Sequence, residues 1–293
     1  MYSPDEYEIL AEACSVACIS IISTLFGRKL TSYDNKFYYI RTLLLLLYTL
    51  SWIITLIGCM LTSTNNGNTV SCSFSFFNMS LIYTVTKILL YLYWTEKLYL
   101  TSMTKTSRLR SFLYNFNIIA LIPYVGIIVL MIYYRVVYVA EAAPYHCWIG
   151  YKWPASITAM AYETVIILMF TAMFAKAYYY PTQDQQASQH AMSISITSQR
   201  NMIIGLVALV TSGLKYALSI AYQDGLRGLI LTCVTSLDVT IVCIVIHWVT
   251  AHPAETQFME RILPQQSSSD KPIKLEIKQH QEVVVLTELN SKV

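Results

Sequence analysis

Seven long apolar segments alternate with short polar connections along most of this chain. Each has about 20 residues or more, which at about 1.5 Å per residue is enough for a helix to cross a bilayer core. Strands that cross a membrane alternate in polarity, whereas residues 42–48 (TLLLLLY) do not. The pattern predicts an all-α membrane protein, a seven-transmembrane helix bundle within residues 1–250. The expected helices are residues 7–26, 42–62, 72–98, 114–139, 155–178, 201–222 and 229–250.

The polar segments predict loops and a tail. The longest internal one, Tyr179–Arg200, is rich in Gln and Ser and is typical of a flexible loop. Apolar side chains recur at helical spacing within residues 251–264, which predicts an amphipathic helix on the membrane surface, with a loose segment as the alternative. Residues 265–293 are rich in Ser, Lys, Glu and Gln and are expected to form a disordered cytosolic tail.

The composition favours a membrane protein. Hydrophobic residues make up 55% of the chain and charged residues 13%, whereas soluble domains have about 25% charged residues. The net charge of +3 is too small to indicate nucleic acid as a partner. The first eight residues are acidic where a signal peptide would be basic, so we expect the first helix to be retained as an anchor.

The distribution of Lys and Arg predicts the orientation of the bundle. Ten of these residues lie in the connections that follow the first, third and fifth segments, and only three lie in the connections on the opposite side. Connections rich in Lys and Arg stay in the cytosol. We therefore expect the N-terminus outside the cell and the C-terminus in the cytosol.

Two of the seven cysteines are placed to form a disulfide. Cys72 begins the third segment, and Cys147 lies between the fourth and fifth, so both face the oxidising outer side in the expected orientation. The other five lie within segments, where a free cysteine behaves as a small apolar side chain. We expect a Cys72–Cys147 bridge across the mouth of the bundle, and two free thiols are the alternative.

Four ionisable side chains lie well inside the apolar segments, where charge is costly and by default marks a working interior. Glu163, Lys215 and Asp238 fall at a shared depth, about 10–13 Å from the outer ends of their segments. Lys215 lies on the middle one of these three segments and is in a position to pair with either carboxylate. Lys87 is deeper, in the third segment, and is expected to extend toward the inner side. The group is either the lining of a polar ligand cavity or a structural ion pair.

The inner end of the third segment carries Glu96 and Lys97, about 36 Å along a helix from Cys72. Together with Arg108 and Arg110 they form the expected surface for a cytosolic partner. This arrangement resembles G-protein-coupled receptors, which have a disulfide-bonded Cys at the outer end of the third helix and an acidic–basic pair at its inner end. The chain departs from them because Lys97 stands where they have Arg, and because their Trp-x-Pro and Asn-Pro-x-x-Tyr motifs are missing.

A closer resemblance covers most of the bundle. Four stretches are similar to an uncharacterised family of fungal seven-transmembrane, G-protein-coupled-receptor-like proteins. The resemblance implies a receptor-like sensor in the plasma membrane, and it identifies neither an extracellular ligand nor a signalling partner. A heterotrimeric G protein is one candidate cytosolic partner of such a sensor. The stretches are 91–99 (YLYWTEKLY), 121–126 (LIPYVG), 147–150 (CWIG) and 238–250 (DVTIVCIVIHWVT).

The residues that several other functions require are missing from the sequence. The seventh segment has no Lys to hold retinal, and of five His only His247 lies in a segment, where a zinc site would need several. We therefore expect no enzyme, no cofactor and no metal. The leading interpretation is a sensor whose outer ligand shifts the populations of two helix arrangements. The alternatives are a transporter or channel for a small solute or ion, or a membrane scaffold.

Overall fold

The computed structural model describes residues 5–31, 38–64, 67–102, 108–141, 145–181, 191–222 and 225–253. These residues are mostly helical, and they include seven helical spans that are long and apolar enough to cross a membrane. The elements in chain order are α1 (Glu6–Thr31), α2 (Tyr38–Thr64), α3 (Thr69–Phe77), η2 (Asn78–Ile82), α4 (Tyr83–Thr101), η3 (Arg108–Arg110), α5 (Phe112–Ile119), α6 (Pro123–Tyr133), β1 (Arg135–Val139), β2 (Cys147–Tyr151), α7 (Trp153–Tyr179), α9 (Ala191–Ala221), β3 (Leu226–Arg227) and α10 (Gly228–Thr250).

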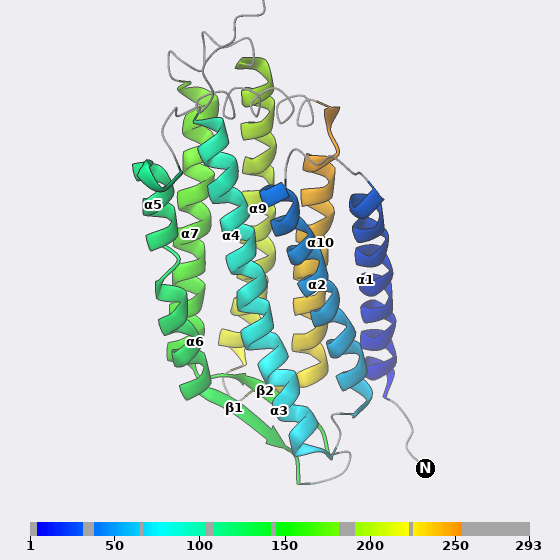
Figure 1. The fold of residues 1–293 in the computed structure, drawn as a ribbon. Helices are drawn as coiled ribbons and strands as arrows, with labels where there is room; N and C mark the ends of the chain where they lie inside the picture. The colour runs from blue at the N-terminus through cyan, green and yellow to red at the C-terminus, as the bar shows by residue number, and fades with distance from the viewer. Residues whose placement is uncertain are drawn as a thin grey trace, which may run out of the picture.

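The seven spans run side by side in alternating directions (Figure 1). Single helices α1, α2, α7, α9 and α10 form five of them, whereas the third consists of α3, η2 and α4 and the fourth of α5 and α6. The number of spans and their helical character agree with the sequence pattern. The third and seventh spans are the most enclosed, with 61% of their apolar windows buried. They therefore form the centre of the bundle.

The fourth span is interrupted where Pro123 begins α6. Proline has no amide hydrogen, and its ring displaces the carbonyl of the residue four positions earlier, which here is Ile119 at the end of α5. The hydroxyl of Tyr162 in α7 donates a hydrogen bond to the carbonyl oxygen of Ala120 at this break. Backbone carbonyls that leave the helical pattern inside a bilayer need such a partner.

Two predicted boundaries are wrong. The fourth helix ends at Tyr133, and Arg135–Val139 forms a strand, because this segment is rich in β-branched residues and pairs with Cys147–Tyr151. The expected loop Tyr179–Arg200 is partly helical, since α9 already begins at Ala191 and extends beyond the apolar segment. The expected amphipathic helix from residue 254 onward and the tail 265–293 lie outside the described residues.

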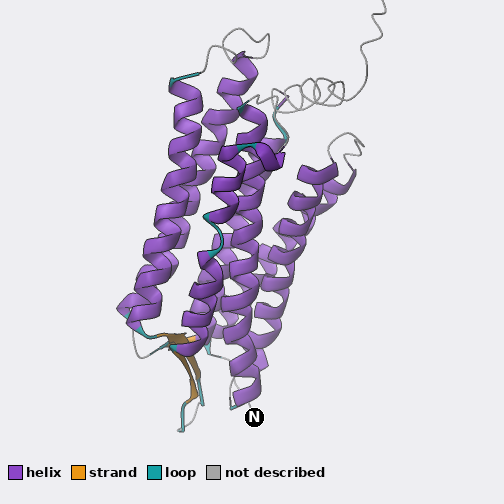
Figure 2. Ribbon diagram, turned by 60° about the vertical axis from the view of Figure 1, so that its left-hand side comes forward, coloured by secondary structure: helices purple, strands orange, loops and turns teal. Residues whose placement is uncertain are grey.

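A small antiparallel sheet closes one end of the bundle. Strands β1, β2 and β3 pair in that order, with Val139 opposite Cys147 and Trp148 opposite Arg227. Figures 1 and 2 show the sheet on the same side as the start of α1, and Figure 1 shows that α3 lies at this end too. We call this side the sheet end and the opposite side the far end.

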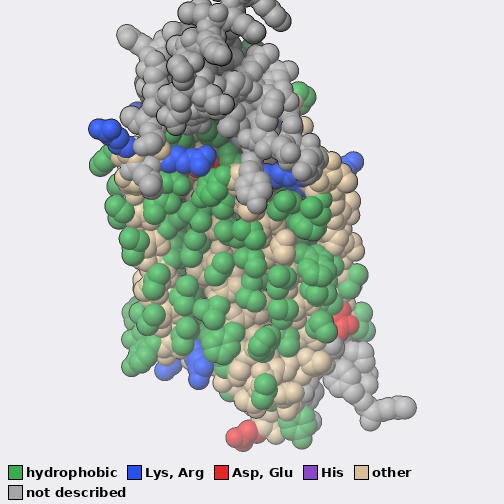
Figure 3. Space-filling model, viewed as in Figure 1, with side chains coloured by type: hydrophobic (Ala, Val, Ile, Leu, Met, Phe, Trp, Pro, Cys, Tyr) green, Lys and Arg blue, Asp and Glu red, His purple; other side chains and the backbone are tan. Residues whose placement is uncertain are grey.

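The outer surface of the bundle is apolar between its two ends. Large hydrophobic side chains are exposed on several spans, as expected where lipid tails replace water. Figure 3 shows hydrophobic side chains along the length of the bundle and blue Lys and Arg side chains near both ends, most of them near the far end. Examples of exposed side chains are Leu10, Met60, Val125, Val165 and Val210.

Candidate functional site

A buried lysine joins three spans at the centre of the bundle. The Lys87 ammonium in α4 lies 3.0 Å from Oδ2 of Asp238 in α10 and 3.3 Å from Oε1 of Glu163 in α7. All three side chains are at most 3% exposed. Charges withdrawn from solvent to this extent persist only when they are paired and hydrogen-bonded, so Lys87 holds the two carboxylates together.

Hydroxyl groups complete the environment of Asp238. The Tyr83 hydroxyl donates to Oδ2 of Asp238 at 2.6 Å, and the Thr211 hydroxyl in α9 donates to Oδ1 at 2.5 Å. The Lys87 ammonium also donates to the hydroxyl of Ser212 in α9. We use the name charge cluster for Tyr83, Lys87, Glu163, Asp238 and the neighbouring Lys215. The cluster links the third, fifth, sixth and seventh spans.

Lys215 does not form the ion pair that its depth predicts, because Lys87 occupies that position. The Lys215 ammonium in α9 is 1% exposed and lies 3.0 Å from the centre of the Tyr83 ring. Among the described residues it has no hydrogen-bond acceptor. An ammonium above an aromatic face is attracted by the electrons of the ring, so the ring of Tyr83 takes the place of a carboxylate.

Tyr83 was not among the predicted site residues, although it lies between the two lysines. The same ring centre is 5.2 Å from the Lys87 ammonium. Tyr83 and Lys87 are four residues apart in one helix, so they share a face. The four-residue spacing from Lys87 was the feature of the sequence that could have identified Tyr83 as a site residue. It was not distinctive, because the chain has 23 Tyr, most of which suit a membrane interface.

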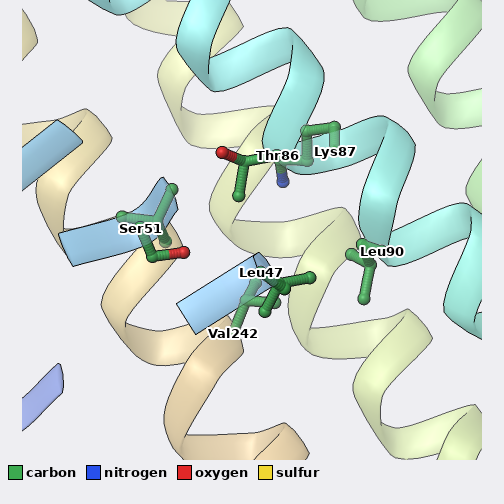
Figure 4. Close-up of a pocket in the computed structure, with 7 residues that line it drawn as sticks. Leu47, Ser51, Thr86, Lys87, Leu90 and Val242 are labelled. Carbon is green, nitrogen blue, oxygen red and sulfur yellow. The ribbon is translucent and has the colours of Figure 1, made fainter. Parts of the chain in front are cut away.

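The charge cluster is tightly packed. A small pocket beside Lys87 is lined by residues of α2, α4 and α10, among them Ser51, Thr86 and Val242 (Figure 4). Its volume is about 10 Å³, which is near the lower limit for one water molecule. This pocket is too small for a larger ligand, and the expected ligand cavity remains a prediction.

The disulfide expected from the sequence is present. Cys72 in α3 and Cys147 in β2 are bonded, with their Cα atoms 5.7 Å apart. The bond fixes the start of the third span to the small sheet. The five other cysteines, all of them in the described residues, are free.

The far end of the third span carries a second ion pair. Arg108 in η3 lies 2.8 Å from Oε1 of Glu96, with 45% of the arginine side chain exposed and 1% of the glutamate. Lys97 is also buried, with its ammonium 5.7 Å from the centre of the Tyr93 ring. The structure thus brings Glu96 and Arg108 together and leaves Arg110 exposed. In this arrangement the two arginines face outward, whereas Glu96 and Lys97 do not.

The fold and the charge cluster define a class: by length and composition, this is a helical multi-pass membrane protein with paired charges in its interior. No protein-family model matches the chain, and no curated protein is similar to it.

Proposed function

We propose that the protein is a receptor-like sensor in the plasma membrane. Its sheet end would face the outside of the cell and its far end the cytosol. The observation that carries the proposal is the charge cluster, in which one lysine joins the third span to two carboxylates on other spans. The excess of Lys and Arg in the far-end connections supports the orientation. A disulfide at the sheet end agrees with an oxidising outer compartment.

Contacts hold the third span at three positions along its length. Cys72 is bonded to the sheet, Lys87 is paired in the middle, and Glu96 is paired with Arg108 at the far end. A movement of the outer mouth is therefore transmitted along one helix to a cytosolic ion pair. A ligand drives such a change only by binding the two arrangements with different affinity.

The two lysines provide a second arrangement. Both ammonium groups lie beside the ring of Tyr83, and only Lys87 is paired with a carboxylate. A rotation of α9 or α4 that replaces Lys87 by Lys215 at Glu163 would exchange one buried pair for another. The total charge of the cluster stays the same, so the exchange avoids the cost of an uncompensated charge.

A heterotrimeric G protein is the proposed cytosolic partner. The test is co-purification of the full-length protein with a fungal G protein in lipid nanodiscs, with and without nutrient extracts. We expect capture of the Gα subunit, and we expect it to change in the Lys215→Met variant, in which the lysine exchange is impossible. An Arg110→Gln variant, at an exposed residue of the same end, tests whether capture needs that surface. Absence of capture by the wild-type protein would contradict this proposal.

The main alternative is a transporter or channel that uses the same charges, and their burial in the membrane interior favours it as the second candidate. Solute and proton uptake into sealed vesicles separates the two. Uptake that is lost in Asp238→Asn or Lys215→Met would replace the receptor proposal, whereas no uptake together with Gα capture supports it. Capture of other cytosolic proteins without either result would indicate a scaffold.

A further inference from the structure

A second polar cluster lies at the sheet end, where the first span begins. The Arg227 guanidinium in β3 lies 2.7 Å from Oδ2 of Asp5 and 3.4 Å from Oε1 of Glu8. The same guanidinium lies 3.0 Å from Nδ1 of His146, which directly precedes the disulfide-bonded Cys147. We call Asp5, Glu8, His146 and Arg227 the sheet-end latch.

The latch connects parts of the chain that are far apart in sequence. Glu8 lies in the first turn of α1 and Asp5 directly precedes that helix, and the Asp5 amide donates to Oε2 of Glu8 at 3.2 Å. Arg227 belongs to the strand that leads into α10, and His146 is held by its carbonyl, which accepts from the amide of Ala140. The start of the first span is thereby fastened to the sheet that the disulfide attaches to the third span.

The contact between Arg227 and His146 requires a neutral imidazole. A guanidinium only donates hydrogen bonds, so Nδ1 of His146 must accept one and carry no proton. Addition of a proton to His146 would place a second donor and a second positive charge against Arg227. The charged groups that face His146 are Arg227 in β3, the carboxylate of Glu8 in α1 and the carboxylate of Asp5, which directly precedes α1.

We propose that the sheet-end latch is pH-sensitive: it holds the start of α1 against the sheet at neutral pH and releases it when His146 gains a proton. The proposal does not depend on whether the protein is a sensor or a transporter. It adds a binding site for a proton from the surrounding medium, which the proposed function does not include.

The pH range of release follows from His146. Burial, and then the neighbouring Arg227, lower the pKa of His146 below its ordinary value of 6.5. The latched state therefore binds a proton less readily than the released state, so it loses stability as the pH falls below about 6.5. The hydrogen bond from Arg227 also lowers the pKa of Asp5 from its ordinary 3.8, so Asp5 keeps its charge throughout this range.

Hydrogen exchange of the first turn of α1 tests the proposal. The amides of Glu8 and Ile9 donate to the carbonyl oxygen of Asp5, so their exchange reports whether this turn is fastened. We compare the full-length wild-type protein with His146→Asn in nanodiscs at pH 7.5 and pH 5.5. Asn places an acceptor near the position of Nδ1 but does not titrate. Because the two proteins are compared at the same pH, the pH dependence of the intrinsic exchange rate cancels. At pH 5.5 we expect these amides to exchange up to about tenfold faster in the wild type than in His146→Asn.

Two further variants complete the experiment. Arg227→Gln should leave the first turn unprotected at both pH values, because it removes the central group of the latch. His247→Gln removes another histidine, in the last turn of α10 at the far end, and should behave like the wild type. Equal protection of the wild type and His146→Asn at pH 5.5 would overturn the proposal. Unchanged protection in Arg227→Gln would do the same.

Discussion

The Nζ atom of Lys87 lies 3.0 Å from Oδ2 of Asp238, so a buried pair of opposite charges joins the third and seventh spans. These are the two most enclosed spans of the bundle. Lipid tails drive helices together only weakly, because they are as apolar as the side chains that they surround. A polar contact at the centre therefore helps to specify which helix faces meet, and the following predictions test this role.

Asp238→Asn should strongly destabilise the bundle. It leaves Lys87 with Glu163 alone and presents an amide to the hydroxyls of Tyr83 and Thr211. Breaking a buried pair costs about 3–5 kcal/mol. Unfolding titrations in mixed micelles measure the change. Glu141→Gln, which removes an exposed carboxylate on the hairpin between β1 and β2, is the matched control and should leave the unfolding midpoint unchanged.

Lys87→Met and Lys215→Met should differ clearly, although both remove a buried ammonium. Lys87→Met leaves two buried carboxylates without their cation, with an expected cost of about 3–5 kcal/mol. Lys215→Met removes an ammonium that has no hydrogen-bond acceptor among the described residues, so stability should change by less than about 1 kcal/mol. The same unfolding titration ranks the two. Equal losses would show that Lys215 is a full member of the ion pair.

Removal of the disulfide should loosen the sheet end. Cys72 and Cys147 are separated by 75 residues, and a bond that closes a loop of this length contributes about 4 kcal/mol in the chain-entropy model. The double variant Cys72→Ala, Cys147→Ala should lose a comparable free energy, and the wild type should match it after reduction. Cys243→Ala, which removes a free buried thiol, shows the effect of a lost cysteine alone. A wild type that is insensitive to reductant would contradict the prediction.

Gly58→Ala tests the contact between α2 and α10. A Cβ atom at Gly58 would lie 2.7 Å from Cγ2 of Thr232, so the Thr232 side chain or the helices themselves would have to shift. Small residues allow such close approach in membranes, and overpacking typically costs about 1–3 kcal/mol. Gly126→Ala is the control, because a Cβ there meets no atom within 4 Å. A Gly58→Ala protein as stable as Gly126→Ala would show that the helices adjust freely.

Seven spans, a disulfide between Cys72 and Cys147 and a set of buried charges could be derived from the sequence. Length and hydropathy determine which segments suit a bilayer, because backbone groups in lipid must satisfy their own hydrogen bonds. The small sheet was missed. Residues 135–139 extend an apolar run, and their pairing with residues 147–151 is a contact that hydropathy does not report.

The partners of the charges were decided by the tertiary structure alone. Depth along a helix follows from counting residues, and it placed Lys215 level with Glu163 and Asp238. Which lysine reaches the carboxylates depends on how each helix is rotated and how closely its neighbours approach. Both the rotation and the approach of the helices arise from the packing of all seven spans together. As a result, Lys87 forms the ion pair with Asp238, and Lys215 lies over the ring of Tyr83.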